Sequence, residues 1–230
     1  GRAGPPEEGG LASRNSGHQM RGDVALTSER RPLKRGAQFL APLAFLVIMV
    51  PLLLCSEPYE RDTDEGINVM KAMLVTRGYR LYADVWSDQP PVYTYVLAGA
   101  FRLFGFTISV ARAVVLVLSC ALLWAAWRFL RLLGGTGNSW AGVFLVVLLP
   151  AYARLSISAM IGLPALALAS VSLAAAAEWH KSRSPTWLIA SAVALSLAVL
   201  TKLFVGILVP ILFIGILASA RSRAGGTRGP

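Results

Sequence analysis

The stretch GAQFLAPLAFLVIMVPLLLCS, from Gly36 to Ser56, contains no charged side chain and lies between Arg35 and Glu57. It is long enough to cross a bilayer, which takes about 20 predominantly apolar residues in a helix. Because lipid cannot satisfy backbone polar groups, the stretch predicts a transmembrane helix and an all-α fold. A signal peptide is the alternative, since a basic region precedes the apolar run. We favour the span, because that basic region is long and no A-x-A cleavage site follows.

The composition of the whole chain is that of a membrane protein. Hydrophobic residues make up 55% of its 230 residues, and the mean hydropathy is +0.59, above the values usual for soluble domains. A net charge of +10 is compatible with nucleic-acid binding. However, the basic residues lie in the tails and between apolar runs, which indicates membrane topology and no nucleic-acid partner. Cys55 and Cys120 lie within apolar segments and predict small core residues, not a disulfide.

Five further apolar segments predict a polytopic bundle of about six transmembrane helices over residues 38–220. They are residues 107–133, 139–153, 155–177, 184–201 and 203–220. Some are short or contain proline, which is tolerated where neighbouring helices cover the exposed backbone groups. Residues 1–37 are rich in Gly, Pro, Ser and Arg, and this composition predicts a disordered basic tail. Residues 221–230 predict a second basic tail.

The charges between these segments predict their orientation. If residues 1–37 lie in the cytoplasm, six crossings place three further basic stretches there, namely residues 127–133, 178–184 and 221–228. This alternation agrees with the positive-inside rule. The loop of residues 56–105 is then extracytoplasmic. We therefore expect an integral membrane protein, in a bacterial plasma membrane, surrounded by membrane lipid.

The acidic residues concentrate in this loop. Seven of the twelve in the sequence lie between Glu57 and Asp88, and three of these fall in RDTDEGIN, residues 61–68. Solvation of an exposed loop would explain them, and the preference for acids at a helix start would explain Asp64 and Glu65. The alternative is a chemical role for a carboxylate held at the membrane surface. Composition and spacing alone leave both interpretations open.

Local patterns in the loop predict short helices at the membrane interface. Apolar residues recur from Ile67 to Leu74 at helical spacing, and Gly78 is a usual residue at the end of a helix. Pro90-Pro91 predicts an extended turn, after which an apolar helical pattern resumes over residues 92–104. Aromatic and apolar residues beside a span are typical of helices that lie in the interface.

A set of motifs runs through the chain in a fixed order. It comprises Asp64-Glu65, Gly78, Tyr82-Ala83-Asp84, Gln89-Pro90-Pro91, Tyr93, Tyr95, Phe101–Gly105, Ala111-Arg112 and Thr201-Lys202. With these motifs, the chain from about Phe39 to Leu217 resembles the integral-membrane glycosyltransferases of the GT-C fold. The resemblance is to the protein O-mannosyltransferase and aminoarabinose-transferase group, of the glycosyltransferase family 39 type.

The resemblance implies a GT-C-like helical bundle that moves a sugar from a polyprenyl-phosphate donor to an extracytoplasmic lipid, glycan or protein. Phosphate leaves readily in such a reaction, but the acceptor needs a base and the phosphate needs cations. The implied catalytic residues are Asp64 as the base and Glu65 as its orienting or sugar-binding neighbour. The implied substrate-binding residues are Tyr82, Asp84, Arg112 and Lys202, the last two as contacts to the lipid phosphate. Snorkelling to the interface is the alternative for these two cations.

Two departures from the family pattern are visible. Gln89 stands where a basic residue is frequent, and residues 160–164, MIGLP, lack the acid that often precedes the proline of a later span. Because family members have roughly twice as many spans, we expect this chain to be the N-terminal portion of a longer protein. It begins with Gly1 and without an initiator Met, so we also expect it to be incomplete at the front. No cofactor and no complete metal-ligand set is evident. A divalent metal ion held partly by Asp64 or Asp84 is left open.

A non-enzymatic transporter or scaffold, or an inactive fragment of such an enzyme, is the alternative function. Transporters hold ionisable residues near the middle of the membrane. Here the predicted spans are nearly devoid of them, and the acids lie in a loop. This distribution favours catalysis at the membrane surface. The donor sugar and the acceptor do not follow from the sequence.

Overall fold

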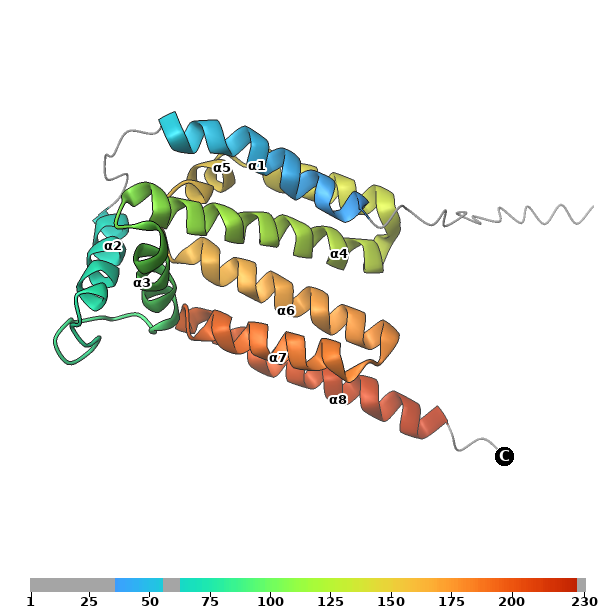
Figure 1. Ribbon diagram of the computed structural model, residues 1–230. Coiled ribbons are helices and arrows are strands. Elements are labelled where there is room, and N and C mark those ends of the chain that lie inside the picture. The colour runs from blue at the N-terminus through green and yellow to red at the C-terminus, as the bar shows by residue number, and fades with distance from the viewer. Residues whose placement is uncertain (1–35, 56–62, 227–230) are drawn as a thin grey trace, which may run out of the picture. The chain divides into compact units, whose positions relative to one another are not determined.

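A computed structural model describes residues 36–55 and 63–226, with side chains up to residue 218 (Figure 1). All of these belong to one compact unit, residues 34–230. The described elements are α1 (Ala37–Cys55), α2 (Thr63–Thr76), α3 (Val92–Phe104), α4 (Ile108–Leu148), α5 (Pro150–Ser156), α6 (Gly162–Ser182), α7 (Pro185–Val199), the 3₁₀ helix η1 (Leu203–Ile207) and α8 (Leu208–Gly226). The predicted all-α fold is therefore confirmed for this part of the chain.

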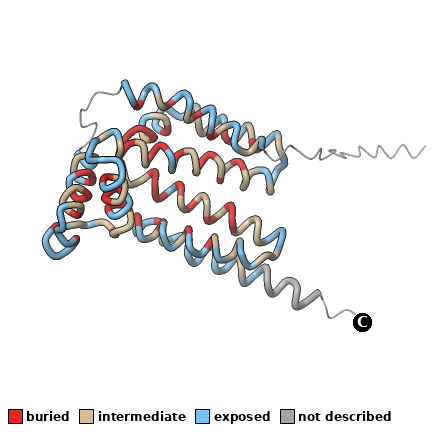
Figure 2. The backbone as a smooth tube through the Cα atoms, in the orientation of Figure 1, coloured by how far each residue is buried: buried red, intermediate tan, exposed pale blue. Residues whose placement is uncertain are grey.

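The long helices lie side by side. α4 packs against both α1 and α6, and α6 packs in turn against α7, as Figure 1 shows. The short helices α2 and α3 pack against each other and gather at one end of this row, which we call the α2–α3 end. Buried residues concentrate along α4 and α6 and on α2 and α3 (Figure 2). Most of residues 1–37, predicted to be a tail, lie outside the described residues.

α4 is two helices joined at Gly135, whose φ of 83° and ψ of −172° are not helical. In a straight helix, Trp127 and Trp140 would lie about 20 Å apart along the axis, at 1.5 Å per residue. Their ring centroids are only 6.3 Å apart, so the chain reverses direction at Gly135. This reversal falls between the apolar segments 107–133 and 139–153, which the sequence predicts to be separate.

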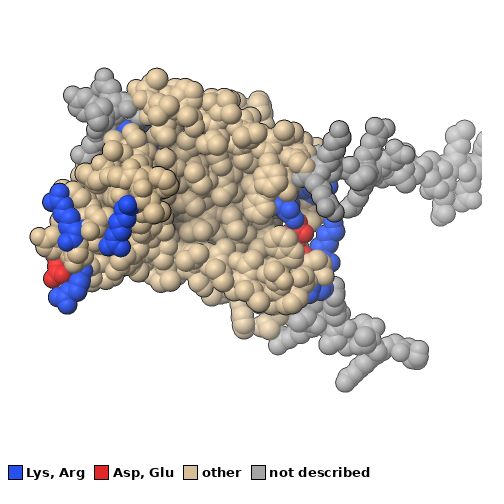
Figure 3. All heavy atoms as spheres, viewed as in Figure 1, with Lys and Arg blue, Asp and Glu red and all other residues tan. Residues whose placement is uncertain are grey.

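Three of the described helices are long and apolar enough to cross a membrane, namely α1, α4 and α6. The helices α3 and α7 and residues 203–218 are apolar but shorter. On the face shown in Figure 3, charged side chains gather at the two ends of the helical body and leave an uncharged band between them. Large apolar side chains such as Phe39, Val47 and Leu54 are exposed on α1. An uncharged, apolar surface of this extent is what a lipid-embedded protein presents.

Small residues bring α6 and α7 close together. The buried face of α6 is rich in alanine, including Ala165, Ala167 and Ala169. Ser172 and Ser191 each donate a hydrogen bond to the other's carbonyl oxygen, at 2.8 and 3.0 Å. Small side chains and paired hydroxyls of this kind are characteristic of helix contacts in membranes, where apolar burial alone gives little preference for protein over lipid.

The end opposite to the α2–α3 end is tied together by one arginine. Arg128 of α4 bonds Glu178 of α6, through Nε at 3.1 Å and also through Nη2, and bonds Gln38 of α1 through Nη1 at 2.8 Å. Its guanidinium also lies over the rings of Trp124 and Trp187, 5.5 and 5.4 Å from their centroids. One side chain thus connects α1, α4, α6 and α7.

The turn at Gly135 can be tested by substitution. We expect Gly135→Ala to lower the free energy of unfolding in detergent micelles by about 1–3 kcal/mol, because its backbone conformation is open almost only to glycine. Gly137 is the matched control, since a Cβ there also has nothing within 4 Å but its φ is not positive. Gly137→Ala should leave stability equal or slightly higher. Equal losses in the two variants would contradict the assignment of the turn.

Candidate functional site

The helix α2 presents two different faces. The predicted helix is confirmed, and Gly78 follows it with a φ of +96°. The apolar residues used to predict it include Ile67 and Met70, which are exposed, whereas its buried face includes Glu65 and Val69. An exposed apolar stripe next to apolar spans fits a helix that contacts the membrane interface. The inward face of α2 is thus partly polar.

Asp64 and Glu65 occupy the first turn of α2, where the positive end of the helix dipole favours acids. Successive residues of an α-helix point about 100° apart. As a result, the side chain of Glu65 is fully buried, whereas Asp64 is exposed. One carboxylate of the pair is buried inside the molecule, and the other belongs to an exposed residue.

Glu65 forms a bidentate ion pair with Arg112 of α4. Nε of Arg112 lies 2.9 Å from Oε1, and Nη2 lies 2.8 Å from Oε2. Both residues have an exposed fraction of 0%. Two parallel charge-assisted bonds are the geometry in which arginine binds carboxylate most strongly. Loss of either partner would leave a buried charge uncompensated, so this pair ties α2 to α4.

Glu65 also bonds the backbone of the connection between α5 and α6. The N–H of Ala159 donates to Oε1 of Glu65 at 2.6 Å. One turn further along α2, Nδ2 of Asn68 donates to the carbonyl oxygen of Ala159 at 3.2 Å. Asn68 and Ala159 were not among the predicted site residues. Their only sequence signal is that Asn68 shares a helix face with Glu65, and nothing in the sequence indicates a backbone partner.

Tyr93 of α3 lies close to this buried group. Its exposed fraction is 2%, and its hydroxyl has no hydrogen-bond partner within the described part of the chain. Burial and, to a smaller extent, the negative charge of Glu65 raise the pKa of Tyr93 above its usual value. The phenol therefore stays protonated. The start of α3 is fixed by a bond from the Val92 N–H to the Leu200 oxygen, 3.1 Å long, at the end of α7.

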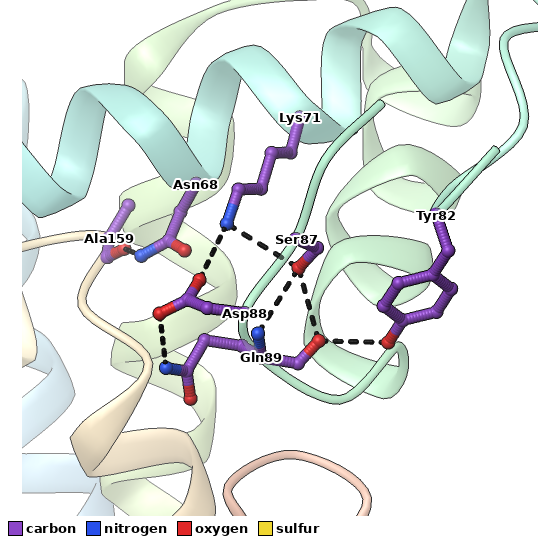
Figure 4. A network of polar contacts seen from close by, with 7 residues as sticks. All are labelled: Asn68, Lys71, Tyr82, Ser87, Asp88, Gln89 and Ala159. Atoms are coloured by element: carbon purple, nitrogen blue, oxygen red, sulfur yellow. Dashed lines mark hydrogen bonds and ion pairs between the residues drawn. The ribbon is translucent and has the colours of Figure 1, made fainter. Parts of the chain in front are cut away.

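Lys71 organises the loop that follows α2 (Figure 4). Its buried Nζ bonds Oδ1 of Asp88 at 3.2 Å and Oγ of Ser87 at 3.4 Å, and lies 5.5 Å from the ring centroid of Trp86. Hydrogen bonds from the Gln89 amide and from Lys71 lower the pKa of Asp88. Lys71 was not among the predicted site residues. Its position inside an amphipathic helix pattern gives no sign that it is buried.

Tyr82 and Asp84, both predicted to bind substrate, are exposed in the same loop. Tyr82 has a φ of +72°, and its hydroxyl donates to the Gln89 carbonyl oxygen at 2.8 Å. Asp84 accepts from the backbone N–H of Arg80 at 2.9 Å and from its Nε at 3.2 Å. These bonds from Arg80 hold the pKa of Asp84 below its usual value. Both side chains bond within the loop, and their contact with substrate stays a prediction.

Lys202 lies at the same end of the body, between α7 and η1. Its side chain is half-buried and makes no hydrogen bond or ion pair with any residue that the structure describes. A Cβ built on Gly162, at the start of α6, would lie 4.0 Å from Nζ of Lys202. Gly162 belongs to the stretch that lacks the acid expected from the family pattern. Among the described residues, no carboxylate forms an ion pair with Lys202.

The structure joins some predicted residues and not others. Glu65 and Arg112 are bonded to each other, and Asp64 precedes Glu65 on the same helix. Asp84 and Tyr82 lie in the loop, and no described bond links them to this pair. Within residues 36–55 and 63–226, no group of three or more His, Cys, Asp or Glu side chains lies close enough to hold a metal ion.

The fold and the site define a helical membrane protein in which a short helix, α2, begins with two acids and is held by a buried ion pair. The chain belongs to the dolichyl-phosphate-mannose-protein mannosyltransferase family, whose model matches residues 88–227, more than half of the chain. It is thus a glycosyltransferase that uses polyprenyl-phosphate sugar donors, which favours the enzyme over a transporter or scaffold. Arg112 and Lys202 lie within the matched residues, whereas α2 precedes them. No curated protein and no solved structure matches the chain.

The buried pair makes a stability prediction. Arg112→Ala should destabilise the protein by about 3–5 kcal/mol, because it leaves the carboxylate of Glu65 buried without its partner. The double variant Glu65→Leu/Arg112→Met should lose less, since both charges are removed together. Unfolding in detergent micelles, followed by circular dichroism, measures both.

Arg80→Ala is the matched control for this experiment. It also removes an arginine from an arginine–carboxylate pair, but Arg80 and Asp84 are exposed at the surface. Its unfolding temperature should stay close to that of the parent. If Arg112→Ala were as stable as Arg80→Ala, the Glu65–Arg112 pair would not be holding α2 in place.

Proposed function

We propose that this chain carries the acceptor base and a donor-phosphate contact of a membrane glycosyltransferase, on the extracytoplasmic side. The observation that carries the proposal is that Glu65 is buried, whereas the adjacent Asp64 is exposed. Glu65 is buried and bonded to Arg112 and to Ala159. The exposed Asp64 is therefore attached to a fixed helix end at the surface, which is what a positioned general base requires.

The proposed topology has six crossings. Figure 1 shows α1, the two parts of α4, α6, α7 and α8 running in alternating directions, so that α1 begins and α8 ends opposite to the α2–α3 end. Several of these segments are short. The 15 residues of α7 rise only about 22 Å, whereas the hydrocarbon core is about 30 Å thick. Neighbouring helices and local thinning accommodate such segments. The basic stretches then face the cytoplasm.

In the proposed reaction, a carboxylate oxygen of Asp64 accepts the proton of an acceptor hydroxyl. The acceptor oxygen bonds the anomeric carbon of the sugar as the bond from that carbon to the phosphate oxygen breaks. The electron pair of that bond leaves with the prenyl phosphate, whose charge Lys202 stabilises. This lysine suits the task because it has no counter-ion among the described residues.

The remaining predicted residues take supporting roles in this proposal. Arg112 holds Glu65 through its bidentate pair, and its contact with the lipid phosphate stays a prediction. Tyr82 and Asp84 belong to a loop that Lys71 anchors to α2. The exposure of Tyr82 and Asp84 in this loop, beside α2, is compatible with a substrate-binding role.

The six-crossing topology predicts opposite labelling of two exposed positions. Thr63 begins α2, and Ser182 ends α6. Cysteines introduced at these positions, one at a time, should react with an impermeant maleimide from opposite faces of sealed membrane vesicles. Inverted vesicles provide the control, because they should exchange the two results. Labelling of both cysteines from the same face would contradict the proposed topology.

The catalytic role predicts a large loss of activity in Asp64→Asn, which keeps the shape of the side chain and removes its basicity. Loss of a general base typically lowers the rate about 10²- to 10⁴-fold. The measurement is transfer of mannose from polyprenyl-phosphate mannose in membranes that contain the complete protein. Membrane abundance should stay the same, because Asp64 is exposed.

Thr63→Ala is the matched control, since it alters the adjacent exposed residue at the helix start. It should retain most of the activity, because at most a helix cap worth about 1 kcal/mol is lost. Transfer by Asp64→Asn at the parental rate would leave the acidic stretch as a solvated surface and would overturn the proposed base.

A further inference from the structure

The connection between α5 and α6 contains a buried residue whose backbone N–H and carbonyl groups need hydrogen-bond partners. Ala159 lies in the connection between α5 and α6, is 0% exposed and is not part of a helix. A buried peptide N–H or carbonyl group without a partner is costly, so native structures almost always supply one. Here the carboxylate of Glu65 accepts from the N–H at 2.6 Å, and the amide of Asn68 donates to the carbonyl at 3.2 Å.

Both partners come from α2, and they stand three residues apart on one face of it. Figure 4 shows the Asn68 amide directed from α2 toward Ala159. A single bond would define the distance between α2 and Ala159 but not their relative orientation. Two bonds to opposite ends of one residue fix both the rotation and the height of the helix. We call Glu65, Asn68 and Ala159 the Ala159 clamp.

The Ala159 clamp lies between the proposed base, Asp64, and the proposed phosphate contact, Lys202. On one side, Asp64 is adjacent to Glu65 on α2. On the other side, Ala159 precedes Gly162, the residue that faces Nζ of Lys202. The attachment of α2 to Ala159 is therefore one of the contacts that connect the proposed base to the proposed phosphate cation.

We infer that Asn68 is a positioning residue for sugar transfer, acting through the Ala159 clamp to hold Asp64 in register with Lys202. The inference rests on the proposed function. Glu65 alone would not suffice, because it is also bonded to Arg112, and the Ala159 carbonyl would be left without its bond. Asn68 suits the task because its amide donates without adding a charge next to Glu65.

The experiment compares Asn68→Ala with its matched control Asn138→Ala, which removes an exposed asparagine near Gly134, far along α4. The first readout is amide hydrogen exchange of the peptide that contains Ala159, in detergent-solubilised full-length protein. Loss of one hydrogen bond should speed exchange about 2- to 10-fold in Asn68→Ala. Asn138→Ala should leave this peptide unchanged. Unchanged exchange in Asn68→Ala would overturn the clamp.

The second readout separates positioning from folding. With polyprenyl-phosphate mannose as donor, kcat per folded molecule should fall at least about tenfold in Asn68→Ala, since small misplacements of reacting groups cost up to about 100-fold. The KM for the donor should stay within about twofold of the parental value. Asn68→Leu, which has a similar shape but can donate no hydrogen bond, should show the same split. Faster exchange with an unchanged kcat in both variants would overturn the positioning role.

These outcomes are distinguishable from failure of the proposed function. Hydrogen exchange reports the clamp whether or not Asp64 is the base. If Asp64→Asn kept full activity while Asn68→Ala exchanged faster, the proposed base would be wrong and the clamp would stand as a structural contact only. If Asp64→Asn were inactive and Asn68→Ala had parental exchange and kcat, the inference about Asn68 alone would be wrong.

Discussion

The α2–α3 end of the molecule depends on the burial of one carboxylate. Glu65 has no access to solvent, and it is tolerated inside because Arg112 meets both of its oxygens with a fixed fork of donors. Desolvating two charges costs several kcal/mol per ion, which only close pairing offsets. The pair therefore has one low-energy arrangement. α2 is held against α4 in that arrangement, and the bond to Ala159 extends the constraint to the start of α6.

The long helices are held together by contacts of a different kind from the buried ion pair of Glu65. Along α6 and α7 the contacts are made by alanines and by the mutual bonds of Ser172 and Ser191. Such contacts give close packing without ionisable groups, which a lipid environment penalises. Charged side chains are placed at the two ends, at Glu65–Arg112 and at Arg128–Glu178. The result is an apolar helical body whose buried ion pairs lie at its two ends.

Local features of this fold could be predicted from the sequence, whereas contacts between distant residues could not. The apolar period and Gly78 predicted the helix before Gly78, and the separation of the apolar segments 107–133 and 139–153 predicted a break between them. Both features are decided by residues close together in the sequence. The partners of Glu65 lie 47 and 94 residues away, and no local pattern specifies them. The exposed apolar residues Ile67 and Met70 of α2 show a similar limit of prediction from sequence. An apolar face predicts a helix but does not reveal whether protein or membrane covers it.

The two acids at the start of α2 occupy different environments, although they are adjacent in the sequence. Because adjacent helical residues point about 100° apart, the two carboxylates leave the helix in different directions. Here Glu65 is buried and Asp64 is exposed, and the buried ion pair holds the helix turn that carries both. In the proposed function, a base attached in this way needs no ordering when the acceptor arrives, since folding has already fixed its helix. On that proposal, Glu65 is the anchor of α2 and Asp64 is the reactive group beside it.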